Sequence, residues 1–214
     1  DTTKKASDLH SMLERFGSGE IRILLGTQMI AKGLDFPNVK LVGIIDADTA
    51  IDLPDFRAAE RTFQLVSQVC GRCGRSEGVA TAIIQTFNPD APAIVLASKT
   101  DYMQFSKQEI AFRQSSQVPP ITRMARCVIR DSNFEQAAGR ADALANRLSD
   151  LAQGEVVVSS AAACVLPRIA DRYRFDVTIT ASSASALQSF LIRARKYIII
   201  GRDLIVDVDP ISLL

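Results

Sequence analysis

Three short apolar runs, separated by helix-like stretches, limit the first half of this chain to an α/β fold. The runs cover residues 21–25, 41–45 and 79–87, and the last of them ends at Asn88-Pro89. Apolar runs of this length, divided by helical segments, are typical of buried parallel strands. The pattern therefore predicts a parallel sheet covered by helices.

Two helices are predicted around these runs. One covers residues 57–69, where Phe63 and Val66 fall on one helical face and Asp55 is a candidate N-terminal cap. The other is a single long helix from 91 to 114. Both would cover the sheet.

A change of pattern at Val118-Pro119-Pro120 marks a domain boundary, because proline cannot continue a helix and stiffens the chain. We expect one domain over residues 1–118 and a second over residues 119–214. The second reads as strand, helix, strand, strand, helix and strand over residues 125–130, 133–148, 155–160, 173–180, 183–197 and 203–208. This order matches the split-βαβ plan of a small α+β domain.

The bulk composition fits a folded protein without demanding any partner. Of the 214 residues, 47% are apolar and 23% are charged, and the net charge is +1, so a DNA contact must come from local geometry. No apolar run approaches the roughly 20 residues that span a bilayer. Four cysteines without dense spacing favour a reducing cytoplasm. The absence of a starting Met indicates a fragment or a processed chain.

An arginine pair follows the first predicted helix, in the sequence Gln68-Val69-Cys70-Gly71-Arg72-Cys73-Gly74-Arg75. If the helix continues, Arg72 and Arg75 lie near one face, and Gln68 would reach the same cleft. A positioned guanidinium stabilises the charge that develops on the γ-phosphate when a nucleoside triphosphate is hydrolysed. The alternative is a helix end whose arginines complement the helix dipole and whose glycines stop it.

The loop after the first apolar run carries groups that bind phosphate. It reads Gly26-Thr27-Gln28-Met29-Ile30-Ala31-Lys32-Gly33-Leu34-Asp35-Phe36-Pro37. Main-chain N–H groups and a threonine hydroxyl at such a turn are suitable ligands for a nucleic-acid backbone. The alternative is an ordinary loop whose glycines only permit the turn.

At these two segments the chain resembles the superfamily 2 helicases. Residues 26–37 look like their motif V and residues 68–75 look like their motif VI. Three further segments are similar to the members that act in replication restart: Leu53-Pro54-Asp55-Phe56-Arg57-Ala58-Ala59-Glu60-Arg61, Arg172-Tyr173-Arg174-Phe175 and Val206-Asp207-Val208-Asp209-Pro210. The likeness covers essentially the whole chain, and the combination of motifs is what makes it specific.

The resemblance implies both a fold and an activity. Residues 1–118 would be the second of two RecA-like motor lobes, and residues 119–214 a domain that docks DNA and proteins. The intact helicase would use ATP and Mg²⁺, held mainly by the first lobe, to move 3′ to 5′ along DNA at stalled forks. No Walker loop or D-E-x-H box occurs in the sequence. We therefore expect the first lobe and a zinc site to precede residue 1, and this chain to be inactive alone.

The resemblance also assigns roles to single residues. Arg72 and Arg75 would be catalytic, with Arg75 as the arginine finger. Nucleotide-binding positions would be Gln68, Gly33 and Asp35, with Asp35 near the ribose. Contacts to the DNA backbone would come from Thr27, Gln28 and Lys32. The expected partners are branched and single-stranded DNA, the acidic tail of single-stranded-DNA-binding protein, and other primosome and helicase-loading proteins.

A basic patch is predicted in the second domain. It consists of Arg172, Tyr173 and Arg174 on a strand, beside a helix that carries Arg193, Arg195 and Lys196. Such a patch can dock an acidic, apolar-tipped peptide or DNA, and the resemblance makes Arg172 a candidate contact for the tail. The alternative is a solvated strand face. Asp176 stands where the family can carry Gln, and its added negative charge argues against tail binding.

Two further patterns suggest metal or thiol chemistry. Cys70 and Cys73 have a redox or zinc spacing, but His10 is the only histidine, and small apolar packing is the favoured interpretation. Two pairs of carboxylates have i, i+2 spacing, Asp46 with Asp48 and Asp207 with Asp209. They would share a face in an extended strand and could hold Mg²⁺. A strand end and a solvated face explain them as well, so no metal is assigned.

Three other functions stay open. The chain could belong to another superfamily 2 translocase, although its last domain argues against that. It could be a non-catalytic module that holds DNA or protein with a motor-like fold. A thiol oxidoreductase is the third alternative, and it predicts a depressed thiolate pKa at Cys70 or Cys73.

Overall fold

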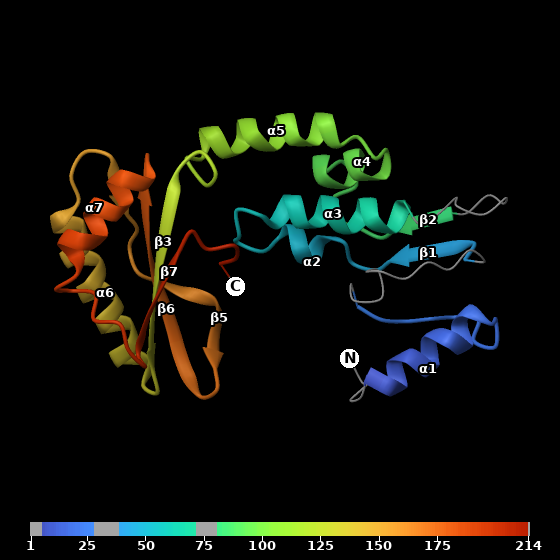
Figure 1. The fold of residues 1–214 in the computed structure, drawn as a ribbon, viewed down its shortest axis with the longest axis horizontal. Helices are drawn as coiled ribbons and strands as arrows, with labels where there is room; N and C mark the ends of the chain where they lie inside the picture. Colours follow the sequence, from blue (N-terminus) through green and yellow to red (C-terminus); the bar gives the residue numbers. More distant parts are fainter. Residues whose placement is uncertain (1–5, 28–38, 72–80, 214) are drawn as a thin grey trace. The chain divides into compact units, whose positions relative to one another are not determined.

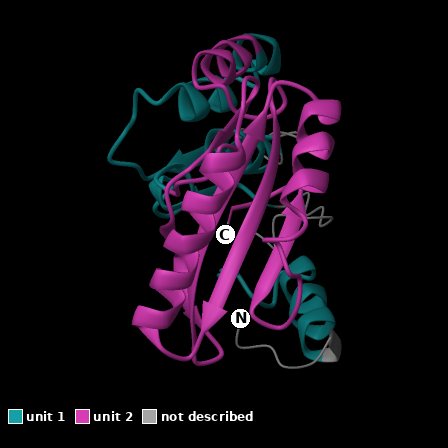
Figure 2. Cartoon of the chain, turned by 90° about the vertical axis from the view of Figure 1, so that its left-hand side faces the viewer, with its two compact units in different colours: residues 1–52, 58–106 teal, residues 53–57, 107–214 magenta. Residues whose placement is uncertain are grey.

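The computed structural model describes residues 6–27, 39–71 and 81–213. They form two compact units, one of residues 1–52 and 58–106 and the other of residues 53–57 and 107–214 (Figure 2). The division falls within helix α5 (Tyr102–Ser115). The domain boundary that the sequence predicts at residue 118 stays a prediction.

The first unit contains a short parallel sheet. Strand β1 (Leu41–Ile44) pairs with β2 (Thr81–Ile84), and Ile44 lies opposite Ile84 (Figure 1). The parallel direction of these two predicted strands is confirmed. Their burial is less complete than the apolar runs indicate, because Leu41 and Ile83 are 60% and 57% exposed.

The strand predicted at residues 21–25 is wrong. This segment has no strand pairing in the part of the chain that the structure describes, and Ile23 and Leu25 are 75% and 81% exposed. An extended segment becomes a strand only when a neighbour satisfies its main-chain N–H and C=O groups, and an apolar run by itself does not supply that neighbour.

Helices α3 (Ala58–Cys70) and α4 (Pro92–Ser98) and the start of α5 hold the core of the first unit. The ring of Phe63 stacks on that of Phe105, with centroids 4.1 Å apart. Val66, Ala93 and Ala97 complete the buried cluster. This confirms the predicted apolar face of the first helix. Two short helices, α1 (Ala6–Gly17) and α2 (Asp48–Ile51), were not predicted.

The single long helix predicted over residues 91–114 is two helices. The chain breaks between α4 and α5, where Thr100 has a positive φ of 56° that no helix residue adopts. Asp101 then starts α5, because its carboxylate accepts the main-chain N–H of Gln104 at 3.0 Å. No glycine or proline lies between the two helices, so the sequence carries no marked helix breaker at this point.

The second unit has the order predicted for it. The predicted strands are β3 (Arg123–Asp131), β4 (Val156–Val158), β6 (Arg172–Ala181) and β7 (Leu204–Val208), and the predicted helices are α6 (Phe134–Leu151) and α7 (Ala184–Ala194). The main sheet is antiparallel with strand order β4-β6-β3-β7. Both helices lie on one face of it (Figure 1).

One strand of this unit was missed. Strand β5 (Ala162–Ile169) pairs with β6 alone, and its register shifts between Ala163 and Arg168. Pro167 lies inside this irregular stretch. Proline cannot donate to a ladder and is confined to edges and bulges, so the sequence argues against a strand here.

The core of the second unit follows the alternation of its strands. Cys127 and Ile129 of β3 and Val177 and Ile179 of β6 are almost fully buried under the helices. An apolar stripe of α6 reaches the same core through Ala137, Ala141, Leu144 and Leu148. Phe134, which begins the stripe, is 48% exposed.

Candidate functional site

The nucleotide side of the candidate site begins where α3 ends. Gln68 lies half-buried in the last turn of this helix. Gly71 closes the turn with its N–H on the carbonyl oxygen of Ser67 at 2.8 Å. A Cβ at Gly71 would lie 3.1 Å from that oxygen, so the helix end has little room for any larger residue. The predicted catalytic residues Arg72 and Arg75 follow directly and lie outside the described residues.

The predicted DNA-binding loop is described only at its start. Thr27 is exposed and follows Gly26 in a segment without regular secondary structure. The other four predicted positions of this loop lie outside the described residues, and they are Gln28, Lys32, Gly33 and Asp35. The structure therefore leaves their predicted roles untested.

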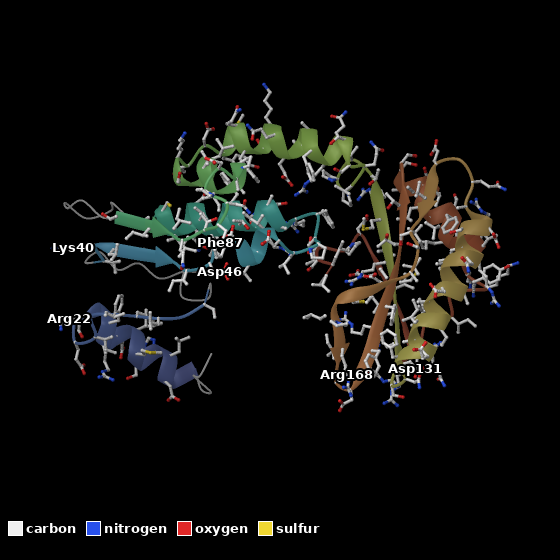
Figure 3. The ribbon with its side chains drawn as sticks, turned by 180° about the vertical axis from the view of Figure 1, so that it is seen from behind. Arg22, Lys40, Asp46, Phe87, Asp131 and Arg168 are labelled. Carbon is white, nitrogen blue, oxygen red and sulfur yellow. The ribbon has the colours of Figure 1, made fainter. Side chains whose placement is uncertain are left out.

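The carboxylates at the end of β1 tie two loops together. Asp48 is buried and accepts the hydroxyl of Thr86 and the main-chain N–H of Phe87, each at 2.8 Å. Burial raises the pKa of Asp48, but these hydrogen bonds outweigh it and hold the pKa below its ordinary value. Asp46 accepts the hydroxyl of Thr49 at 2.7 Å, and it lies at the same end of the sheet as Phe87 (Figure 3). Protein donors thus engage both carboxylates.

The predicted basic patch of the second unit is engaged in contacts of its own. Arg172 forms an ion pair with Asp203, and Arg174 donates to the carbonyl oxygen of Leu166 at 3.2 Å. The ring of Tyr173 meets that of Phe134 edge-on, with centroids 5.5 Å apart. These contacts fix all three side chains at the start of β6.

Acidic residues border this patch. Arg140 of α6 lies 3.1 Å from Asp131 and 4.0 Å from Asp203, so these groups form a chain of charges that ends at Arg172. The hydrogen bond from Arg172 lowers the pKa of Asp203 below its ordinary value. The sequence did not predict Asp131, Arg140 or Asp203 as members of the site, because nothing in their spacing relates them to Arg172.

A second group of cations lies at the end of α7. Arg193, Arg195 and Lys196 are exposed. The guanidinium of Arg193 lies over the ring of Phe190, 5.8 Å from its centroid, and the ammonium of Lys196 lies 4.8 Å from the centroid of Tyr197. Such contacts hold a cation against an aromatic face without neutralising its charge.

The described cysteines have the character of packing residues. Burial raises the pKa of the Cys127 thiol to about 12 and also raises that of Cys164. Cys70 is half-buried and Cys73 lies outside the described residues. Within the described ranges no group of His, Cys, Asp and Glu is arranged to hold a metal ion. In those same ranges no helix combines the length and apolarity that crossing a membrane requires.

Two family models match the chain. One, described as "Helicase conserved C-terminal domain", matches residues 1–77, and the other, described as "Primosomal protein N C-terminal domain", matches residues 114–211. The first match includes both predicted motif segments. The α/β unit is therefore a RecA-like helicase lobe, and the predicted fold class is confirmed.

Curated relatives match over most of the chain. The "Replication restart protein PriA" of Bacillus subtilis is 41% identical over 191 residues, which are 89% of this chain and 24% of the relative. The protein of the same name from Treponema pallidum is 40% identical over 98% of this chain and 32% of its own length. That from Synechocystis is 33% identical over 100% of this chain and 26% of its own length. The chain thus spans about a quarter to a third of these relatives.

Proposed function

Because the chain belongs to the PriA family of replication restart proteins, we propose that it supplies the second motor lobe and a docking domain to an ATP-dependent 3′-to-5′ DNA helicase. Such a helicase would work in the cytoplasm, at stalled forks and in primosome assembly. The observation that carries the proposal is that one helicase-lobe match, over residues 1–77, contains both Gly26–Pro37 and Gln68–Arg75.

The arginines after α3 would act on the nucleotide. Arg75 would stabilise the charge that develops on the γ-phosphate, and Arg72, three residues earlier in the sequence, would support it. What supports these roles is the end of α3, where the N–H of Gly71 donates to the carbonyl oxygen of Ser67 and a Cβ at Gly71 would lie 3.1 Å from that oxygen. Gln68 would line the same cleft. Gly33 and Asp35 would contact the nucleotide from the other predicted loop.

ATP and Mg²⁺ would be held mainly by residues that this sequence does not contain. No Walker loop occurs in the chain, and within the described ranges no cluster of carboxylates is arranged as a metal site. The chain by itself should therefore not turn over ATP. Zinc would likewise bind elsewhere in the complete helicase.

A test of this role uses the complete helicase, in which this chain is joined to a first motor lobe. We expect Arg75→Ala to lower the kcat of DNA-stimulated ATP hydrolysis by about 10³-fold or more, with a much smaller change in KM. Arg15→Ala is the matched control, because Arg15 is exposed and pairs with the nearby Glu20 at 2.7 Å. Full turnover in Arg75→Ala would rule out the finger and favour a non-catalytic binding module.

The loop after residue 26 would grip the DNA backbone. Thr27, Gln28 and Lys32 offer a hydroxyl, an amide and an ammonium group, which are ordinary phosphate ligands. Lys32→Ala should weaken binding to single-stranded DNA of any sequence and reduce the salt slope by about one. Lys40→Ala, a change of the same charge on an exposed residue before β1, should leave the slope unchanged.

The start of β6 would dock the acidic tail of single-stranded-DNA-binding protein, through Arg172, Tyr173 and Arg174. Since Arg172 already pairs with Asp203, a peptide carboxylate must compete with that residue. We therefore expect Arg172→Ala to weaken tail binding and Asp203→Asn to strengthen it, each by about ten-fold. Calorimetric titration with the tail peptide measures both. A helicase whose affinity follows neither change would dock the tail elsewhere.

A further inference from the structure

The edge strand of the second unit presents main-chain groups that pair with no strand among the described residues. Strand β7 ends the sheet and its ladder is with β3 alone. The N–H of Asp209 donates to the carbonyl oxygen of Met124 at 2.8 Å, so Asp209 points its main chain toward β3. Because inward and outward residues alternate in an antiparallel ladder, Val206 and Val208 direct their N–H and C=O groups outward.

An apolar groove of about 560 Å³ lies along this outward edge. Val206 and Val208 line it from the strand, and Leu187, Leu191 and Ile192 line it from α7. Ile192 is 66% exposed and Val208 is 51% exposed. The two valines that carry the outward main-chain groups therefore also present apolar side chains to the groove. The unpaired N–H and C=O groups of an exposed edge strand are a template for another strand.

The charged side chains that line the groove carry a net positive charge. They are Arg123, Arg195 and Asp209. Arg195 is exposed and lies at the end of α7. At the opposite end of the groove, Arg123 is balanced by Asp209 at 3.1 Å. The net charge therefore favours an acidic occupant.

We propose that β7 and α7 bind an extended acidic segment of a partner protein, which adds to the sheet as a strand beside β7. Its main chain pairs with Val206 and Val208, its alternate apolar side chains enter the groove, and its acidic side chains approach Arg195. A second copy of this chain fits less well. Edge-to-edge pairing of two β7 strands would bring two basic α7 helices together on one face.

This surface differs from the one proposed for the tail. Arg172 lies at the start of β6, where the next residue, Tyr173, pairs with Asp131 at the end of β3. Val208 pairs with Ala125, toward the opposite end of β3. The binding surface on β7 and α7 is therefore separate from the proposed docking site for single-stranded-DNA-binding protein, and a test of one site does not decide the other.

The test is a fluorescence-anisotropy titration of the whole 214-residue chain. The probe is a labelled ten-residue peptide of alternating isoleucine and glutamate, and its companion carries lysine in place of glutamate. We expect saturable binding of the acidic peptide, at least about ten-fold tighter than that of the basic one. Absence of saturation up to about 1 mM overturns the proposal, and so does equal binding of the two peptides.

Single-residue variants of β7 and of the groove test where the peptide binds. Val208→Pro removes an outward N–H and leaves the ladder to β3 intact, and Ile192→Asp places a charge in the groove at an exposed position. Each should weaken the acidic peptide by about ten-fold or more. Ile205→Ala is the control for the strand, because the side chain of Ile205 lies on the opposite face of the sheet from that of Val206. It should bind normally.

Two charge-reversal variants test whether the groove recognises the acidic side chains of the peptide. Arg195→Glu should weaken the acidic peptide, whereas Arg193→Glu, two residues earlier on a side chain that lies over Phe190, should not. If Val208→Pro does not fold, Ile192→Asp and Arg195→Glu still decide the matter. Binding that ignores both of these changes overturns the site. A concentration-dependent dimer that excludes the peptide and that Ile192→Asp dissolves would make the occupant a second copy, which also overturns the proposal.

Discussion

Asp176 of β6 accepts a charge-assisted hydrogen bond from Arg126 of the neighbouring strand β3, with Nε and Oδ2 2.7 Å apart. Arg126 is 3% exposed. The carboxylate of Asp176 therefore neutralises a cation inside the molecule and adds little net charge to the surface of β6. The prediction that Asp176 opposes tail binding rests on its negative charge alone. Arg126, which neutralises that charge, lies 50 residues earlier in the chain, so the local sequence does not reveal the pair.

Removal of one member of this pair should cost more than removal of both. Asp176→Ala leaves the buried guanidinium of Arg126 without its carboxylate, and we expect the free energy of unfolding to fall by about 3 kcal/mol. The double variant Arg126→Met with Asp176→Leu should lose less, since neither charge is then buried. Urea denaturation of the three proteins measures the difference.

The exposed pair of Arg123 and Asp209 is the control for this experiment, because both side chains are about half exposed. Arg123→Ala should change the free energy of unfolding by less than about 1 kcal/mol. If the double variant of the buried pair were as unstable as Asp176→Ala, the loss would come from packing and not from an unpaired charge.

Asp55 fastens the C-terminal end of the chain to the segment before α3. Its Oδ2 accepts the hydroxyl of Ser212 at 3.1 Å and the main-chain N–H of Leu213 at 3.0 Å, while Oδ1 accepts the N–H of Arg57. We expect Asp55→Ala to lower the free energy of unfolding by about 2 kcal/mol, because three half-buried donors lose the buried carboxylate that accepts them. The amide of Leu213 should exchange with solvent about ten-fold faster, which NMR measures.

Ser212→Ala is the graded comparison for Asp55→Ala. It removes one of the hydrogen bonds and should cost about 1 kcal/mol or less. If the exchange rate of the Leu213 amide stayed the same in Asp55→Ala, the carboxylate would not hold the C-terminal segment. The sequence predicted Asp55 as a helix cap, and its Oδ1 accepts the N–H of Arg57 at 2.9 Å, directly before α3 begins at Ala58. The contacts with Ser212 and Leu213 add a long-range role that the sequence did not indicate.

Elements that are defined by local periodicity could be predicted from the sequence. Strand β3 and helix α6 occur within three residues of their predicted ends. The apolar spacing of α6 predicts its buried face, whereas β3 is an apolar run that is buried on both faces. Strand β5 could not be found in this way, because it depends on its partner β6 and contains Pro167 at an irregular position.

The candidate site also contains residues that could be predicted from the sequence and contacts that could not. Gln68, Arg72 and Arg75 could be named from the sequence because a helicase motif is contiguous along the chain, and their roles stay predictions. The helix that carries Gln68 ends at Cys70. The pairing of Arg172 with Asp203 joins positions 31 residues apart, one at the start of β6 and the other directly before β7. Such a contact follows from strand order and register, which no short pattern encodes.

Helix α6 begins with a side-chain cap at Asn133. The side-chain oxygen of Asn133 accepts the main-chain N–H of Gln136 at 3.0 Å. We expect Asn133→Ala to lower the free energy of unfolding by about 1 kcal/mol, because the first turn loses an acceptor for its N–H groups. Asn133→Ser should retain most of the stability, since serine caps helices as well. Equal losses in the two variants, measured by thermal or urea denaturation, would argue against the cap.

Asp131 should make stability depend on pH in acid. The N–H of Asn133, at 3.0 Å, is the main cause that lowers the pKa of Asp131 below its ordinary value, and Arg140 at 3.1 Å adds to it. A carboxyl group whose pKa is lower in the folded than in the unfolded state stabilises the fold above the unfolded pKa of about 3.9. That contribution is lost as the pH falls through the folded pKa.

Asp131→Asn should therefore be less stable than the parent at pH 7, and the two stabilities should converge in strong acid. Urea midpoints from pH 2 to pH 7, together with the carboxyl ¹³C shift of Asp131, measure this. A carboxyl shift that titrates at or above pH 4 would contradict the assignment, because the folded pKa would then not be lowered.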